Sequence, residues 1–423
     1  MNASLSFLFV TWNGGGNVPP VLGLAARLIK RGHRVRILTE PCLKEAVLKI
    51  GADYVAFDQH FTRTDASIDL IQDWNAKPLT IPSVDNILVR PAFDVAKETQ
   101  SLLVEQHCDV LVADFMMLGA LMAAEALGIK RVALFHMPEY LPGPGRPPGG
   151  LGLLPSNTPL GRIRDAILTR VFNKVINQYL PALNRAREAL SLSALEAFTD
   201  IFHQADLRLI QTSKAFDAPI DPAPENVRYV GPVLDDPSWP DSPIALWPEA
   251  DKRPLLVVSL STTFQNQQNA LENIIQSVSS LDVRCLVTLG PAITKDAFIL
   301  PDNVIALEGV PHSQVFPMAS AVITHAGHGT VMRALAHGLP LVCLPMGRDQ
   351  LDNATLVAYH GAGLRLSQKA GVRTIRRAIC QVLEDTRFKE NAGVLQVKIQ
   401  KEASAFTAEM CLENLAAQGD RNE

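Results

Sequence analysis

The sequence lacks an excess of positive charge. Its 423 residues contain 39 Lys and Arg against 43 Asp and Glu, which gives a formal net charge of −4. A field of this sign over the whole protein does not attract nucleic acid or anionic lipid, so neither is an expected partner. Charged residues make up only 19% of the chain and hydrophobic residues 47%, a composition typical of a globular protein and too apolar for a disordered one.

Cysteine pairs and long apolar segments are also missing. The six cysteines form no C-x-x-C pair and stand at no metal-ligand spacing, which predicts reduced thiols in a cytoplasmic protein. The apolar stretch Leu5–Val10 follows no basic residues and is too short for a signal peptide. The most apolar later stretch, Val110–Leu127, contains Asp114 and Glu125 and therefore indicates a buried segment and no membrane span.

What is present is an alternation of strand and helix patterns. The β-rich segment Leu5–Thr11 precedes a glycine-rich loop, helical spacing of apolar residues at Pro20–Arg31, and a second β segment at Arg34–Thr39. This order is a βαβ unit, and its repetition predicts parallel sheets with helices on both faces. Elements are further predicted in the first half at Tyr54–Phe57, Val110–Ala113 and Arg131–Phe135 (strands) and at Leu118–Leu127 and Arg162–Ala197 (helices).

Two breaks divide this pattern. Residues 138–160 are rich in proline and glycine and predict a long functional loop, whereas residues 231–254 contain six prolines and predict an interdomain linker. The alternation then restarts, with strands predicted at Leu255–Leu260, Arg284–Leu289, Val304–Leu307, Ala321–Thr324 and Leu341–Leu344, and helices at Ala270–Ser280, at Thr330–His337 and over much of Thr374–Ala417.

The predicted fold class is therefore α/β, with two Rossmann-like, doubly wound parallel-sheet domains that face a cleft. The first domain is expected at 1–230, the linker at 231–254 and the second domain at 255–400. A helix within 401–423 is expected to pack back on the first domain. Clefts between such sheets are common ligand sites.

One segment carries the strongest local signal for a ligand. The strand Ala321–Thr324 ends in His325-Ala-Gly-His-Gly-Thr330, a loop of small residues that passes directly into a helix. Gly327 and Gly329 permit close approach to the backbone, and the free amides of Gly329, Thr330 and the next residue would lie at the positive end of the helix. This arrangement suits a phosphate, to which His325 can add a hydrogen bond. Asp349 and Gln350 follow the next strand, and a carboxylate beside an amide suits sugar hydroxyls.

These residues carry a resemblance to a known family. The stretch Gly309–Asn353 resembles the donor-sugar signature of the UDP-glycosyltransferase superfamily, whose members are inverting enzymes of the GT-B fold. The segments Gly14-Gly-Gly-Asn-Val-Pro-Pro20 and Val258-Ser-Leu-Ser261-Thr-Thr263 resemble its bacterial branch, the macrolide-type natural-product glycosyltransferases. The resemblance implies that the nucleotide base faces Val310, that the diphosphate lies at Ser261, His325, Gly327, Gly329 and Thr330, and that the sugar lies at Asp349 and Gln350.

The chain departs from the family pattern in its first loop. Many members have a catalytic His in Gly-His-Val-x-Pro, where this sequence reads Gly16-Asn17-Val18-Pro19-Pro20. Asn17 has no useful proton affinity and cannot be a general base. Asp114 and His136 each end a predicted strand of the first domain and are the candidate replacements. Asn17, Met137 and Tyr140 are expected on the acceptor side.

The resemblance implies transfer of a sugar from a UDP- or TDP-sugar to a small apolar acceptor. The protein is expected to be a monomer or homodimer with no cofactor beyond the donor. It contains no Asp-x-Asp, and the His325/His328 pair has no further ligand nearby, so no metal is expected. Two alternatives stay open: an inactive sugar-nucleotide-binding accessory protein, motivated by Asn17, and a dinucleotide-dependent oxidoreductase using the Asn13–Pro19 loop. The sugar, the nucleotide base, the acceptor and the linkage also stay open.

Overall fold

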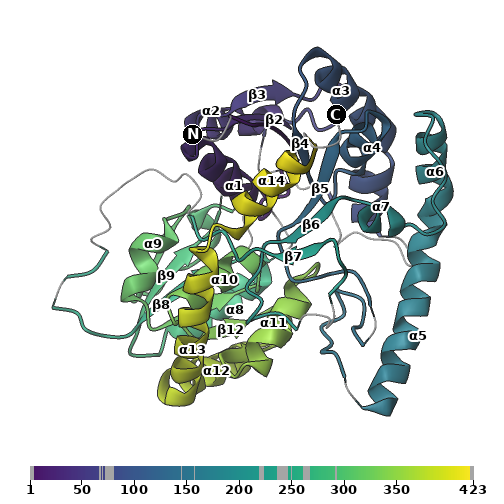
Figure 1. The fold of residues 1–423 in the computed structure, drawn as a ribbon. Coiled ribbons are helices and arrows are strands. Elements are labelled where there is room, and N and C mark those ends of the chain that lie inside the picture. The colour runs from purple at the N-terminus through teal and green to yellow at the C-terminus, as the bar shows by residue number, and fades with distance from the viewer. Residues whose placement is uncertain are drawn as a thin grey trace.

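The computed structural model describes residues 4–65, 68, 70–71, 81–143, 145–156, 158–218, 223–235, 246–248, 250–260, 267–290 and 293–419. Its strands form two separate sheets in which all pairs are parallel. Figure 1 shows one sheet above the other, the first built from the N-terminal half and the second from the C-terminal half. The predicted pair of Rossmann-like domains is confirmed.

The first sheet has seven strands in the order β3-β2-β1-β4-β5-β6-β7. Odd and even residues of its strands face opposite sides, so that Phe7 and Phe9 join one core and Leu8 and Val10 the other. Its strands are β1 Ser6–Val10, β2 Arg34–Thr39, β3 Asp53–Ala56, β4 Val110–Asp114, β5 Lys130–Phe135, β6 Leu207–Ile210 and β7 Val227–Tyr229. Its helices are α1 Val18–Lys30, α2 Lys44–Lys49, α3 Ala92–Glu105, α4 Leu118–Ala126, α5 Pro159–Ile176, α6 Leu180–Glu188 and α7 Asp200–His203.

The second sheet has six strands in the order β10-β9-β8-β11-β12-β13. Helices α10, α11 and α13 cover one face, and α8 and α12 cover the other. Its strands are β8 Leu255–Ser259, β9 Arg284–Thr288, β10 Val304–Leu307, β11 Ala321–Thr324, β12 Leu341–Cys343 and β13 Gly363–Arg365. Its helices are α8 Gln268–Val278, α9 His312–Val315, α10 His328–Ala336, α11 Gln350–Tyr359, α12 Val372–Glu384 and α13 Thr386–Ala403.

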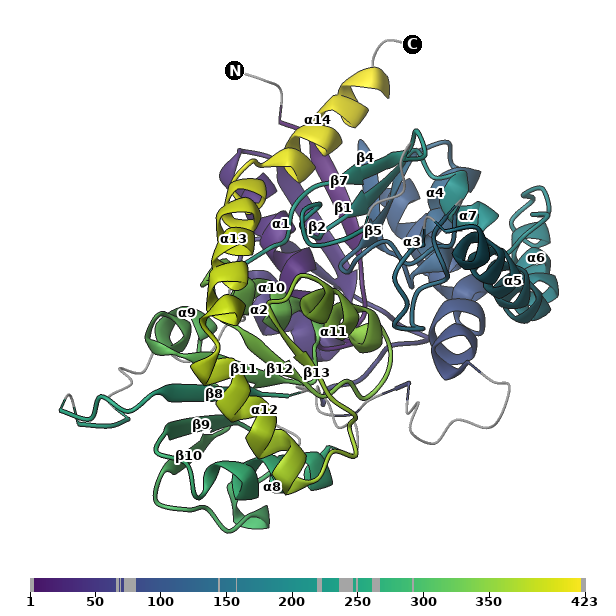
Figure 2. The same ribbon diagram turned by 90° about the horizontal axis from the view of Figure 1, so that it is seen from below.

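The last helix, α14 Thr407–Gly419, lies against the first domain. Leu412 and Leu415 join the core formed by α1 and one face of the first sheet. Glu413 accepts hydrogen bonds from Arg31 at 2.6 Å and contacts the His33 ring at 2.9 Å. In Figure 2, α13 and α14 run from the lower domain to the upper one, so the C-terminal segment joins the two domains. Part of the expected linker, residues 236–245 and 249, lies outside the described residues.

In each sheet the strand order reverses direction at one position. In the first sheet this point lies between β1 and β4, and in the second between β8 and β11. Loops that leave adjacent strands there diverge to opposite faces of the sheet and leave a crevice at its carboxyl edge, where α/β proteins bind ligands. A ligand-binding site is therefore expected at the loops after β1, β4, β8 and β11.

Candidate active site

A cavity of about 510 Å³ lies between the carboxyl edges of the two sheets. Of the described residues expected in the site, all except Asp114 line it. Ser261 lies outside the described residues. The expected residues that line the cavity are Asn17, His136, Met137, Tyr140, Val310, His325, Gly327, Gly329, Thr330, Asp349 and Gln350.

The loop between β1 and α1 holds Asn17 in a fixed orientation. Its amide nitrogen donates to Asp114 Oδ2 at 2.7 Å and to the Trp12 carbonyl at 2.8 Å. Its amide oxygen accepts from the Gly14 nitrogen at 2.9 Å. A Cβ on Gly14 would lie 2.8 Å from the Trp12 ring, which explains why this tight turn contains glycine. The side chain of Asn17 is thus a structural link between the first loop and β4.

Asp114 lies behind the cavity lining. It is only 1% exposed, and both of its oxygens accept hydrogen bonds: Oδ2 from Asn17, and Oδ1 from the Met116 backbone at 3.0 Å. A carboxylate that already accepts from two donors is poorly placed to take a proton from a molecule in the cavity.

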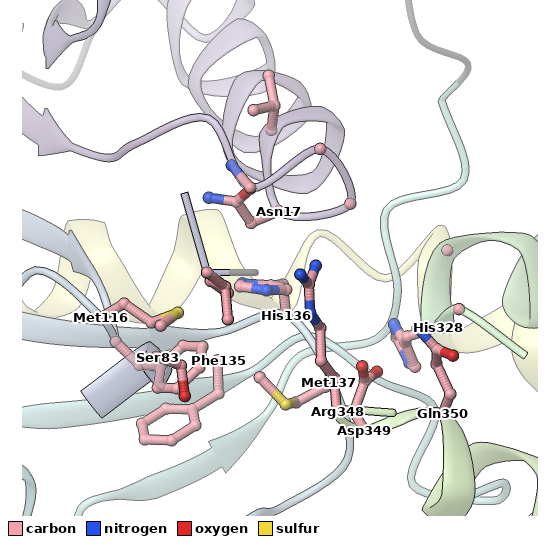
Figure 3. Close-up of a pocket in the computed structure, with 18 of the residues that line it drawn as sticks. Asn17, Ser83, Met116, Phe135, His136, Met137, His328, Arg348, Asp349 and Gln350 are labelled. Carbon is pink, nitrogen blue, oxygen red and sulfur yellow. The ribbon is translucent and has the colours of Figure 1, made fainter. Parts of the chain in front are cut away.

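His136 ends the neighbouring strand and does line the cavity. Its Nδ1 lies 3.8 Å from Asp114 Oδ2, beyond hydrogen-bond distance but close enough for electrostatic attraction to a protonated ring. That nitrogen is buried and has no hydrogen-bond partner among the described residues. Figure 3 shows His136 below Asn17, with the guanidinium of Arg348 beside the imidazole. Of the two candidate bases, His136 is the one that a molecule in the cavity can reach.

The loop between β11 and α10 forms the opposite wall. Helix α10 begins at His328, two residues earlier than the sequence predicted, with Gly327 as its N-cap. Because Val331 makes the first intrahelical hydrogen bond, to the Gly327 carbonyl at 3.1 Å, the amides without an intrahelical partner are those of His328, Gly329 and Thr330. The anion site predicted at the helix terminus therefore starts one residue earlier than expected. A Cβ on Gly327 would lie 2.5 Å from His325 Nε2, so only glycine leaves the imidazole in place.

His325 is a neutral hydrogen-bonding group at neutral pH. Burial lowers its pKa to about 4, and the positive charge of Arg348 acts in the same direction. The helix terminus, and not a charged imidazole, is therefore the electropositive feature of this loop. His328, one turn further, is occupied by a hydrogen bond between its Nε2 and Thr212 of the first domain at 2.8 Å.

The low pKa of His325 has a consequence for stability. An unfolded His has a pKa near 6.5, so the native state binds fewer protons between pH 6.5 and 4. The stabilisation is complete above pH 6.5 and is lost as the pH falls towards 4. We expect wild type to lose about 2 kcal/mol more than His325→Gln between pH 7 and pH 5, measured from urea unfolding at both pH values. Equal losses in both proteins would contradict the assignment.

The donor-sugar candidates lie after β12. Asp349 Oδ2 accepts from Asn353 at 2.8 Å, and burial raises the pKa of Asp349. Gln350 uses its amide oxygen to accept from the backbone nitrogens of Met346 at 2.8 Å and Gly347 at 3.2 Å. The amide oxygen of Gln350 therefore shapes the loop, whereas the Asp349 carboxylate is the acidic group among the donor-sugar candidates that line the cavity.

Two arginines of the cavity lining were not predicted from the sequence. Arg333 follows Gly329 by one helical turn and donates to the Asp235 carbonyl at 2.7 Å. Arg348 has a left-handed backbone with φ of +57°, which is uncommon for a residue with a Cβ, and extends into the cavity. Arg333 is four residues after Gly329, and residues at that spacing share one face of a helix. This spacing could have predicted that Arg333 lies on the same side of α10 as the glycine. The direction of Arg348 depends on its backbone conformation, for which the sequence holds no signal.

The far end of the cavity is apolar and belongs to the first domain. Met137 and Tyr140, which were expected on the acceptor side, also line the cavity. The remaining walls are almost entirely hydrophobic, with Phe115 stacked on Phe135 at 4.9 Å between ring centroids. Further apolar residues of this end are Trp12, Ile71, Ile81, Val84, Leu88, Met116, Leu141, Phe172, Ile176, Phe198 and Phe202.

The proline- and glycine-rich segment after β5 begins at this cavity and crosses to the second domain. The backbone nitrogens of Gly150 and Gly152 both donate to the carboxylate of Asp352 in α11, the latter at 2.7 Å. The segment is thus anchored on α11 and lies between the two domains.

The described part of the chain contains no group of three or more His, Cys, Asp or Glu side chains that could hold a metal ion. It also contains no helix long and apolar enough to cross a membrane.

Two Rossmann-like domains that face a cleft, with a helix terminus on one wall and an apolar pocket at one end, form the architecture of the GT-B fold. Solved structures agree on the fold. The glycosyltransferase of kitacinnamycin has a TM-score of 0.76 at 20% identity and covers 98% of this chain and 100% of its own. The calicheamicin glycosyltransferase CalG4 has a TM-score of 0.70 at 20% identity, with 99% of each chain covered.

Sequence comparison identifies the family. Residues 272–411 match the family described as erythromycin biosynthesis protein CIII-like, C-terminal domain. The 4'-demethylrebeccamycin synthase of Lentzea aerocolonigenes is 31% identical over 399 residues, which cover 92% of this chain and 94% of that protein. The chain therefore belongs to the natural-product branch of the UDP-glycosyltransferase superfamily and is a glycosyltransferase of the natural-product type. The alternatives of an inactive accessory protein and of an oxidoreductase are not supported.

Proposed function

We propose that the protein transfers a sugar from a UDP- or TDP-sugar to a small apolar acceptor with inversion at the anomeric carbon. The observation that carries this proposal is the cavity itself, in which a helix terminus and an aromatic pocket open into one space on either side of His136. The diphosphate would accept hydrogen bonds from the amides of Gly329 and Thr330 and from His325. The nucleotide base would lie at Val310 and the sugar at Asp349.

In the proposed reaction His136 is the general base. It takes the proton of the acceptor hydroxyl as the acceptor oxygen forms its bond to the anomeric carbon. The bond from that carbon to the diphosphate oxygen breaks, and its electron pair leaves with the diphosphate. Asp114, 3.8 Å from His136, would stabilise the imidazolium electrostatically. The amides at the start of α10 would stabilise the negative charge that develops on the leaving group, so the mechanism needs no metal.

Binding of the donor is the direct test. Isothermal titration with a panel of UDP- and TDP-sugars should find at least one ligand. In the proposal the helix terminus and His325 bind the diphosphate, and Asp349 binds the sugar. Gly327→Ala should weaken that ligand about tenfold, since its Cβ displaces His325 and removes roughly one hydrogen bond.

The matched control is Gly393→Ala in α13, where a Cβ meets nothing within 4 Å. This variant should bind the donor as wild type does. If no UDP- or TDP-sugar binds the wild-type protein, the proposed function is wrong.

A further inference from the structure

Helix α5 carries an apolar stripe on its outer face. Leu160, Ile163, Ile167 and Val171 follow one another at intervals of three or four residues and are 81%, 57%, 51% and 54% exposed. This spacing places them along one side of the helix. We call these four residues the α5 stripe. Four large aliphatic side chains aligned in water are unusual for a surface helix of a globular protein.

The charge around the α5 stripe is positive. Arg170 and Lys174 follow Ile167 and Val171 by three residues, so they lie beside the stripe. Both are exposed, and neither forms an ion pair among the described residues. The one acidic residue of the helix, Asp165, is buried and paired with Arg164 at 2.7 Å. The outward face of α5 therefore combines apolar and basic side chains in a protein whose net charge is −4.

The opposite face of α5 is held by the first domain. Phe172 and Ile176 line the apolar end of the cavity, and Ile176 is buried in the core of that domain. Figure 1 shows α5 at the outer edge of the molecule, away from α14, and Figure 2 also shows it at the periphery of the first domain. The helix is thus anchored on one side and open on the other.

We propose that α5 docks the protein on an anionic lipid surface. A helix with aliphatic side chains on one face and basic side chains beside them lies in the plane of a membrane interface, held by apolar burial and by attraction to acidic lipids. The bilayer needs no groove on the protein, and a single convex helix offers none. The negative charge of the whole protein opposes such binding, so the local charge of α5 has to outweigh it at close range, which it can do within a Debye length.

Two other occupants fit the face less well. A second copy packed stripe against stripe would bring the basic residues of both α5 helices together, and like charges at that distance repel. A protein partner commonly anchors on aromatic side chains seated in pockets, and the α5 stripe contains only aliphatic side chains. Docking on lipid would also bring the apolar end of the cavity close to the membrane, where an apolar molecule is concentrated.

Vesicle flotation of the full-length protein tests the proposal. We expect binding to vesicles of 30% phosphatidylserine in phosphatidylcholine, with little binding to pure phosphatidylcholine and a decrease as salt is raised. Ile163→Glu with Ile167→Glu should abolish binding. Replacing Arg170 and Lys174 with Gln should weaken it roughly 25-fold, about fivefold per charge near an anionic surface.

The matched control replaces two equally exposed aliphatic residues on α13, Val394 (58%) and Val397 (68%), with Glu. This control should bind the anionic vesicles as wild type does. The proposal is overturned if wild type binds no vesicle, or if the α5 and α13 variants lose binding equally. It is also overturned if wild type is a dimer in analytical ultracentrifugation and Ile163→Glu with Ile167→Glu makes the protein monomeric. A melting curve of each variant shows that it is folded.

Discussion

Replacing His136 with alanine is expected to lower kcat by roughly 10²–10⁴-fold, the range that a positioned general base contributes. The physical reason is access: His136 lines the cavity, whereas the oxygens of Asp114 already accept from Asn17 and Met116. The Kd for the donor diphosphate should stay unchanged, because the donor candidates lie on the second domain. Steady-state kinetics and calorimetry on the same preparation separate the two effects.

Asp114→Ala is the informative comparison. It removes the negative charge 3.8 Å from His136 and the acceptor of the Asn17 amide, so we expect a smaller decrease in kcat than for His136→Ala. Both variants should bind the donor as wild type does, so that the comparison of kcat values reports on the chemical step. Full turnover in His136→Ala together with loss of turnover in Asp114→Ala would make Asp114 the base and refute our assignment.

The fold was predictable where the strands are continuous and buried. Arg34–Thr39, Val304–Leu307 and Ala321–Thr324 have the bounds that the sequence predicted, because alternating or continuous apolar residues end sharply at polar or turn residues. The short strands β6 and β7 were not predicted. In the structure β6 pairs with β5, and β7 pairs with β6, so these two strands complete the first sheet through pairing between segments that are separated in the sequence.

Helix starts were less predictable than strands. The sequence predicts a helix from Pro20, whereas α1 begins at Val18, directly after Asn17. Similarly, α10 begins at His328 and not at Thr330, and the side chain of His328 forms a hydrogen bond with Thr212 of the first domain. Contacts between residues far apart in the sequence thus decide where the helices begin.

In the candidate site, too, some features were predictable from the sequence and others were not. Residues that belong to a loop of recognisable pattern, such as His325 and Gly327, were predicted from the small-residue loop between a strand and a helix, and they line the cavity. The hydrogen-bond partners of the side chains were not predictable. The sequence indicates that Asn17 and Asp114 both lie at the ends of strands of the first sheet, but not that Asn17 donates to Asp114 at 2.7 Å and thereby occupies an oxygen of that carboxylate.

The hydrogen bond between Asn17 and Asp114 leads to the second prediction of a large change in kcat. Asn17→His introduced into the His136→Ala protein is expected to restore kcat by at least about tenfold, toward the contribution of a general base. An imidazole at position 17 would lie in the cavity lining, and one ring nitrogen could donate to Asp114 as the Asn17 amide does. The other nitrogen would then be an acceptor that faces the substrate. Asn17→His in the wild-type background should raise turnover of ordinary alcohols.

The matched control is Asn17→Gln in the same His136→Ala background, because it keeps an amide donor near Asp114 and supplies no base. It should give no recovery, and the recovery with His should vanish again when Asp114→Ala is added, since the new imidazole loses the partner that orients it. Recovered activity should also carry an acidic limb in the kcat–pH profile. If the Asn17→His, His136→Ala protein binds the donor normally but its kcat stays at the level of His136→Ala, a side chain at position 17 does not contact the acceptor hydroxyl. The first loop would then serve only to hold β4 in place.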